Sequence, residues 1–193
     1  SGADKNDSTC SLKKVESFTS TDIDISKIKI AYLPSVMDSE GLDAEIKQRT
    51  MDILQILKLN GATIGTENFD KLDYLIPTYY VLTTAEASSN LSRYDGVRYG
   101  YRSPNANDLE SVYKKSRAEG FGKEVKRRIM LGTFVLSEGF YDAYYSKAQQ
   151  VRRLISERTF DIFKAYDLIL MPAAPTPAWK IGDKSDDPVM MYL

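Results

Sequence analysis

Arg128 lies on the apolar face of a helix that the sequence predicts between residues 123 and 136. At about 100° per residue, that face gathers Phe121, Val125, Ile129, Gly132, Val135 and Leu136, whereas Lys126 and Arg127 fall outside it. An unpaired charge on a buried face is strongly destabilising, so Arg128 needs an anionic partner. An internal carboxylate and a ligand carboxylate or phosphate both fit a guanidinium, and the spacing does not decide between them.

A pair of tyrosines, Tyr79 and Tyr80, follows Pro77, a residue that suits the first turn of a helix running to about Leu91. Exposed N–H groups and a phenol near the start of a helix can hold an anion or a polar ligand. The alternative is that both tyrosines belong to the core and expose one edge to water. The residues alone leave both alternatives open.

Arginine and tyrosine alternate through residues 93–102, as Arg93, Tyr94, Arg98, Tyr99, Tyr101 and Arg102. Such interleaving is typical of sites for single-stranded nucleic acid. Two features favour ordinary packing around a loop instead. Asp95-Gly96 predicts a turn within the segment, and the whole chain is balanced, with 26 Lys and Arg against 27 Asp and Glu.

The chain contains no histidine, which excludes a Ser-His-Asp triad, a Cys-His dyad and a His-containing metal site within it. Cys10 is the only cysteine, so we expect no disulfide framework and a reducing, cytoplasmic setting. No apolar run approaches the ~18 residues of a membrane span, and the first residues do not have the pattern of a signal peptide, so we expect neither in this protein. The 193 residues suffice for a single domain over 1–193.

The elements that position these residues follow from periodicity. Residues 27–34 predict a short strand, residues 42–59 a helix that Asn60-Gly61 ends, and residues 62–66 a second strand. This βαβ order indicates an α/β fold with a parallel or mixed sheet. Helices are predicted over 77–91, from Asn107 or Asp108 to 118, over 123–136 and over 141–163, followed by a fully buried strand at 168–171. Together these patterns predict a parallel or mixed sheet with flanking helices.

Several segments together resemble the amidase signature family and, within it, the branch formed by the A subunits of glutamyl-tRNA(Gln) or aspartyl-tRNA(Asn) amidotransferases. The matching residues are 7–9, 77–80, 86–100, 117–132, 141–149, 166–172 and 187–192. The resemblance implies that the chain is the C-terminal part of an amidase signature domain. The family's Ser–cis-Ser–Lys triad and its Gly/Ser-rich signature have no counterpart here, so we expect no catalytic residue in the chain and no activity from it alone.

The resemblance also implies roles for two positions. In family members that bind glutamine, an arginine of the Lys126-Arg127-Arg128 run binds the amino acid, and it maps onto Arg128. The first tyrosine of the pair, Tyr79, lines the same glutamine pocket. The family's acidic residue for the substrate α-amino group follows Met191-Tyr192 closely, beyond Leu193. The resemblance therefore favours the ligand alternative for Arg128.

As a whole protein, the family implies a glutamine-hydrolysing subunit that supplies ammonia for the amidation of misacylated tRNA. Its partners are the amidotransferase B and C subunits. No cofactor is expected on this chain, since the partner subunit uses ATP and Mg²⁺. Two rival interpretations are another amidase-signature hydrolase of a small amide and a non-catalytic interaction or scaffold fragment.

Overall fold

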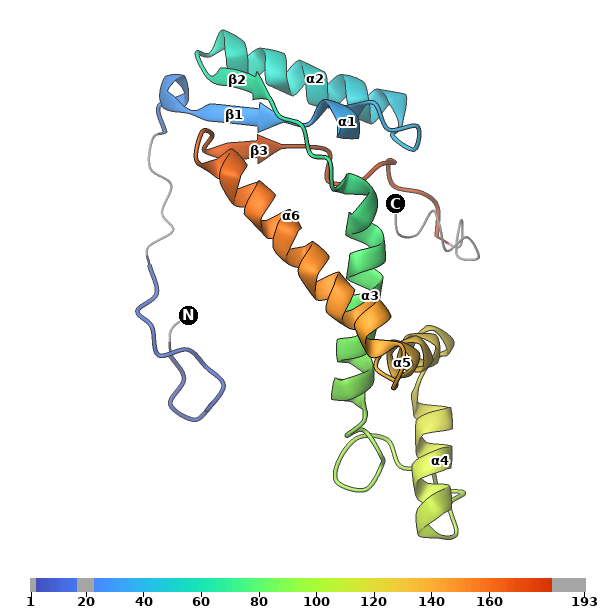
Figure 1. Cartoon of the computed structure of the whole chain (residues 1–193). Coiled ribbons are helices and arrows are strands. Elements are labelled where there is room, and N and C mark those ends of the chain that lie inside the picture. The colour runs from blue at the N-terminus through green and yellow to red at the C-terminus, as the bar shows by residue number, and fades with distance from the viewer. Residues whose placement is uncertain (1–2, 17–22, 182–193) are drawn as a thin grey trace.

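A three-stranded parallel sheet forms one end of the molecule in the computed structural model, which describes residues 3–16 and 23–181 (Figure 1). Strand β1 (Lys29–Tyr32) lies in the centre, between β2 (Thr63–Thr66) and β3 (Leu168–Leu170). Ile30 pairs in register with Ile64 on one side and with Leu168 on the other. The sheet therefore joins strands from near the beginning and near the end of the described chain.

Helix α2 (Ala44–Leu59) connects β1 to β2 and begins and ends as its sequence dictates. The Asp43 carboxylate caps its N-terminus by accepting the N–H groups of Glu45 and Ile46. After Leu59 the chain turns at Gly61, whose φ of +97° favours glycine. The predicted helix end at Asn60-Gly61 is confirmed.

Two short helices, η1 (Ile25–Lys27) and α1 (Pro34–Met37), lie beside the sheet, and the later helices build a long extension away from it (Figure 1). The later helices are η2 (Leu72–Tyr74), α3 (Leu75–Leu91), α4 (Leu109–Gly120), α5 (Lys123–Val135), the π-helix η3 (Tyr141–Ser146) and α6 (Lys147–Phe163). Helix α3 leads from the sheet to the far end, where α4 and α5 lie, and α6 returns to β3. No helix in the described ranges is both long and apolar enough to cross a membrane.

The core lies on both faces of the sheet. Ala31, Leu33, Phe69 and Ile162 form a buried cluster on the face that α6 covers, whereas Ile30, Leu54 and Ala62 form another on the face that α2 covers. Alternate residues of β1 thus serve opposite faces, as the two-residue period of a strand requires. This helix–sheet–helix layering confirms the predicted α/β class with flanking helices, and the three described strands are all parallel.

Three sequence predictions need correction. The helix expected from Pro77 begins two residues earlier, at Leu75, because η2 leads directly into it. The helix expected over 141–163 starts with one π-helical stretch before it becomes α-helical. The strand expected to be fully buried is not: Leu168 is 52% exposed, because β3 lies at the edge of the described sheet.

Candidate functional site

Helices α3 and α5 cross in close contact at Gly132, and this crossing positions both predicted site residues. A Cβ atom built on Gly132 would lie 2.0 Å from the carbonyl oxygen of Thr84, a residue with no exposed surface. Beside it, the hydroxyl groups of Ser88 and Thr133 lie 3.0 Å apart. Only glycine permits this separation, so Gly132 fixes how α5 sits on α3.

Arg128 lies one turn before Gly132 on α5, with its side chain 26% exposed. Its Nε atom is 3.3 Å from Oε1 of Glu124, an i,i+4 ion pair. Lys126 and Arg127 are exposed, as the helical periodicity predicts. The internal carboxylate that the sequence left as one alternative is therefore present. Glu124 also pairs with Arg127, at 3.0 Å, so it is shared between two guanidinium groups.

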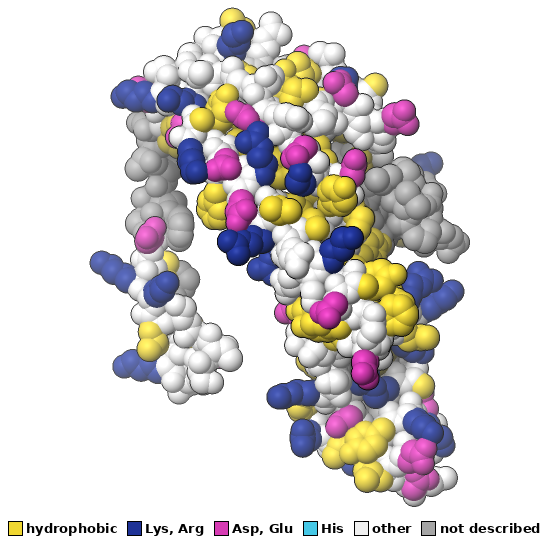
Figure 2. Space-filling view, viewed as in Figure 1, with side chains coloured by type: hydrophobic (Ala, Val, Ile, Leu, Met, Phe, Trp, Pro, Cys, Tyr) yellow, Lys and Arg dark blue, Asp and Glu magenta, His cyan; other side chains and the backbone are white. Residues whose placement is uncertain are grey.

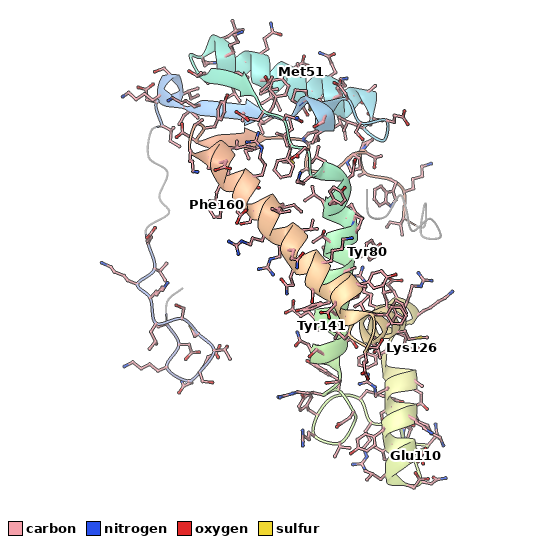
Figure 3. All side chains as sticks on the ribbon, in the orientation of Figure 1. Met51, Tyr80, Glu110, Lys126, Tyr141 and Phe160 are labelled. Carbon is pink, nitrogen blue, oxygen red and sulfur yellow. The ribbon has the colours of Figure 1, made fainter. Side chains whose placement is uncertain are left out.

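Tyr79 lies on α3, about one turn from the crossing in the direction of the sheet, and is 44% exposed. Its ring meets that of Tyr80 edge to face, with centroids 5.7 Å apart. Tyr80 of α3 and Lys126 of α5 are labelled in Figure 3, which locates the two helices. Because α3 begins at Leu75, Tyr79 is its fifth residue and lies past the four unpaired N–H groups of the helix start. Tyr79 is therefore not among the residues whose own N–H groups are unpaired at the helix start, and its role in ligand binding stays a prediction.

Arg128 and Tyr79 thus each lie about one turn from the α3–α5 crossing, on α5 and on α3 respectively. Neither side chain lines the pockets described below. The segment 187–192, with the Met191-Tyr192 motif, lies outside the described residues. The assignment of Arg128 and Tyr79 to a glutamine site stays a prediction.

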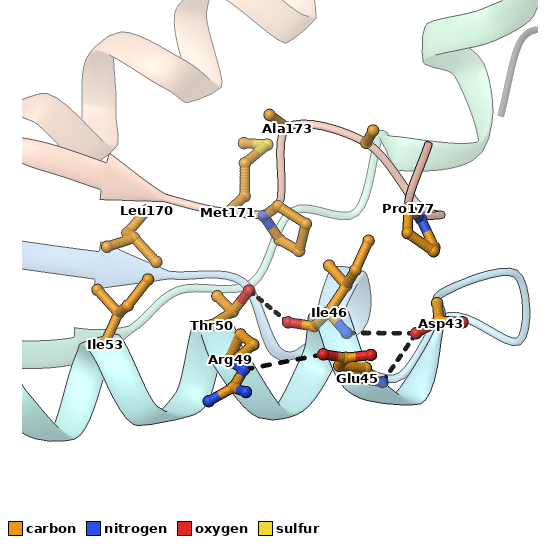
Figure 4. Close-up of a pocket in the computed structure, with 12 residues that line it drawn as sticks. Asp43, Glu45, Ile46, Arg49, Thr50, Ile53, Leu170, Met171, Ala173 and Pro177 are labelled. Atoms are coloured by element: carbon orange, nitrogen blue, oxygen red, sulfur yellow. Dashed lines mark hydrogen bonds and ion pairs between the residues drawn. The ribbon is translucent and has the colours of Figure 1, made fainter. Parts of the chain in front are cut away.

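A separate pocket of about 480 Å³ lies where β3 ends and α2 begins (Figure 4). It is lined by Asp43, Glu45, Ile46, Arg49, Thr50, Ile53, residues 170–174 and Pro177. Its polar groups already have local partners. Asp43 caps α2, Thr50 donates to the carbonyl of Ile46 at 2.8 Å, and Arg49 lies 4.0 Å from Glu45. The sequence analysis did not single out this pocket, although the carboxyl end of a parallel strand is a common place for ligands.

The described residues offer little acid–base or metal chemistry elsewhere. Within 3–16 and 23–181, no three His, Cys, Asp or Glu side chains group as metal ligands. The hydrogen bond that Tyr101 donates to Glu119 raises the pKa of its phenol. Hydrogen bonds from Thr9 and from Lys164 lower the pKa of Asp7 and of Asp161, respectively. None of these groups belongs to α3 or α5.

Comparisons with known proteins show which proteins this chain is similar to. The sequence model of the Amidase family matches residues 1–193. The A subunits of glutamyl-tRNA(Gln) amidotransferase from Listeria innocua and Halalkalibacterium halodurans are each 52% identical over all 193 residues. The match covers 40% of each of these relatives. The chain therefore spans well under half the length of the curated relatives it matches.

A solved structure shows the same fold. The crystal structure of the A subunit of glutamyl-tRNA(Gln) amidotransferase from Thermotoga maritima superposes with a TM-score of 0.66 at 34% sequence identity. The superposition covers 99% of this chain and 36% of that one. The described sheet and its flanking helices are thus similar to a part of that larger protein.

Proposed function

The chain belongs to the Amidase family, and on that premise we propose that it is the C-terminal part of the glutamine-hydrolysing A subunit of a tRNA-dependent amidotransferase. One observation carries the proposal: identity of 52% to an amidotransferase A subunit extends over every residue of the chain. In the complete protein, glutamine would be hydrolysed to release ammonia. The B subunit would use that ammonia, with ATP and Mg²⁺, to amidate misacylated tRNA, and a C subunit would stabilise the pair.

In this proposal Arg128 binds the α-carboxylate of glutamine. A guanidinium group presents donors in a planar arrangement that matches both oxygens of a carboxylate. The partly buried position of Arg128 strengthens such a bond, since less water competes for it. The shared, half-exposed Glu124 holds the side chain against α5 until the ligand carboxylate arrives.

Tyr79 contributes a partly exposed phenol to the same glutamine pocket. Its exposure leaves the ring available to a ligand, and its edge-to-face contact with Tyr80 restricts its orientation. Both residues bind and orient the substrate, so the nucleophile and its base come from outside this chain. Correct orientation alone accelerates a reaction by lowering the entropy lost at the transition state.

The proposal is tested by measuring glutaminase activity and glutamine binding of this chain beside the complete amidotransferase. We expect ammonia release only from the complete protein, because the proposed nucleophile lies outside residues 1–193. Glutaminase activity of the isolated chain would contradict the proposal, since it would require a nucleophile within these residues.

A further inference from the structure

Three arginines of the segment that joins α3 to α4 remain without an anionic partner among the described residues. Arg93, Arg98 and Arg102 are all exposed. Across the described part of the chain, no ion pair or side-chain hydrogen bond involves any of them. We call residues 92–103 the arginine loop.

The acidic side chains nearest in sequence to these arginines are occupied elsewhere. Asp95 accepts the N–H of Val97 at 2.9 Å, and Asp108 caps α4. Glu119 accepts hydrogen bonds from Tyr101 at 2.7 Å and from Ser103 at 3.1 Å. The arginine loop therefore presents three cations that the described part of the fold does not pair.

The loop is held in one shape against α4. Gly96 is buried with φ of +78°, and a Cβ atom there would lie 2.5 Å from Oγ of Ser116. That oxygen accepts the N–H of Ser103 at 3.0 Å. Arg117 donates to the carbonyl oxygens of Leu91 at 2.7 Å and Tyr94 at 3.2 Å. Because the backbone is already ordered, a ligand that binds the loop loses little affinity to ordering it.

Aromatic rings lie between the arginines. Tyr94, Tyr99 and Tyr101 are each about half-exposed, and the rings of Tyr94 and Tyr99 meet edge to face at 5.3 Å. Packing around the loop, the alternative that the sequence favoured, accounts for these contacts and for Arg117. It does not account for Arg93, Arg98 and Arg102, which are exposed to solvent.

The surrounding segment is also the basic part of a nearly neutral chain. Residues 92–128 contain ten Lys and Arg against five Asp and Glu, whereas the whole chain has 26 against 27. Dark blue Lys and Arg side chains are visible on both sides of the lower end of the molecule, where α4 lies (Figure 2). A local excess of positive charge attracts a polyanion even when the net charge is close to zero.

We propose that the arginine loop binds a single-stranded segment of RNA. Guanidinium groups of Arg93, Arg98 and Arg102 contact phosphates, and exposed tyrosine rings stack on bases. The choice of RNA rests on the proposed amidotransferase function, but the contact itself is independent of glutamine. It makes this chain a direct contributor to RNA binding.

Fluorescence anisotropy with a labelled single-stranded RNA of about 12 nucleotides tests the proposal at salt concentrations from about 50 to 200 mM. The variant carries Arg93→Gln, Arg98→Gln and Arg102→Gln. We expect at least about tenfold weaker binding at the lowest salt. We also expect the slope of log K against log salt to become shallower by about 2, since each phosphate contact contributes about 0.7.

The matched control carries Arg49→Gln, Arg152→Gln and Arg153→Gln, three exposed arginines outside the loop with the same change in charge. Its affinity should stay within about threefold of the unmodified protein, since non-specific charge loss acts weakly at a distance. Equal weakening in both variants would overturn the proposal. If the loop variant loses its far-UV circular dichroism signal, Arg98→Gln alone should still weaken binding, and an unchanged affinity would overturn the proposal.

A polyglutamate peptide of the same charge distinguishes RNA from an acidic protein surface. We expect it to compete poorly, because it offers no bases to stack on tyrosine. Competition as strong as that of unlabelled RNA would contradict the proposal in favour of a protein partner. Glutamine is omitted from these RNA-binding measurements. A lack of RNA binding would therefore not contradict the proposed glutamine site, and a lack of glutaminase activity would not contradict RNA binding by the arginine loop.

Discussion

Arg128 shares its carboxylate partner, Glu124, with Arg127, and this sharing is what makes a ligand role physically reasonable. Both ion pairs are short-range contacts on the surface of α5, and Glu124 is about half-exposed. The exposed Arg127–Glu124 pair contributes only about 0–1 kcal/mol to stability. Because Glu124 is shared in this way, it does not hold Arg128 exclusively, and a substrate carboxylate can join the partly buried guanidinium.

The sequence predicted the placement of Arg128 but not its partner. Helical periodicity set Arg128 apart from Lys126 and Arg127, and the structure confirms that difference in exposure. The sequence also contains the i,i+4 spacing of Glu124 and Arg128, which favours an ion pair on a helix and could have identified Glu124 as the internal carboxylate. Sequence periodicity does not predict whether Arg128 also binds a ligand, because an ion pair within the chain and one with a substrate both require an arginine at this position.

Gly132→Ala tests the close approach of α5 to α3. In a helix interior this change alone would stabilise by about 1 kcal/mol. Here the new Cβ would meet the Thr84 carbonyl, a backbone atom that cannot rotate away, so we expect destabilisation of about 1–3 kcal/mol. Urea denaturation measures it.

Met130→Ala is the control for that change, because Met130 lies on the same helix and is exposed. Its effect should stay within about 0.5 kcal/mol. If Gly132→Ala proved as stable as the unmodified protein, the helices would not be locked at this crossing.

At the scale of elements, most boundaries followed from local sequence. Asp108 caps α4 in a capping box with Ser111, and Gly139 turns the chain with φ of +85°, as expected of these residues. Errors arose where tertiary context decides. The apolar run 168–171 indicates a strand, but its exposure depends on which element covers it, and no local pattern contains that information.

Arg158 joins α6 to the segment after β2. Its guanidinium donates to Glu67 at 2.7 Å and to the carbonyl of Asn68 at 2.7 and 3.1 Å, and the side chains of Arg158 and Glu67 are 30% and 25% exposed. Arg158→Met removes these bonds and leaves Glu67 without this cation. We expect a loss of about 1–3 kcal/mol in the free energy of unfolding, measured by urea denaturation.

Arg153→Met is the matched control on the same helix. Arg153 pairs with Glu157 at 2.7 Å, but its side chain is 81% exposed. Its loss should change stability by no more than about 0.5 kcal/mol. Similar effects of the two substitutions would show that Arg158 does not connect the elements.

At the scale of the whole molecule, the described part of the sheet carries an apolar groove next to β3. A groove of about 690 Å³ is lined by Ile23, Ile25, Ile28, Ile30, Leu57 and residues 167–171. An edge strand beside exposed apolar surface is a template for association with another chain. The isolated chain is therefore expected to self-associate as its concentration rises.

Leu168→Lys should suppress that association, because it places a charge on the exposed edge. Burial of a leucine contributes about 1.5–3 kcal/mol, so the dissociation constant should rise at least about tenfold in sedimentation equilibrium. Leu109→Lys, at an exposed site on α4, should leave it unchanged. A monomeric unmodified chain at all concentrations would contradict the expectation.

The central claim is that Arg128 binds the substrate of a glutamine-hydrolysing enzyme, and steady-state kinetics of the complete amidotransferase test it most directly. With Arg128→Ala, we predict that KM for glutamine rises at least about tenfold, with a smaller fall in kcat because the lost contact also orients the substrate. With Arg127→Ala, a neighbour that shares Glu124 but is exposed, KM should not change. An unchanged KM in Arg128→Ala would contradict the account.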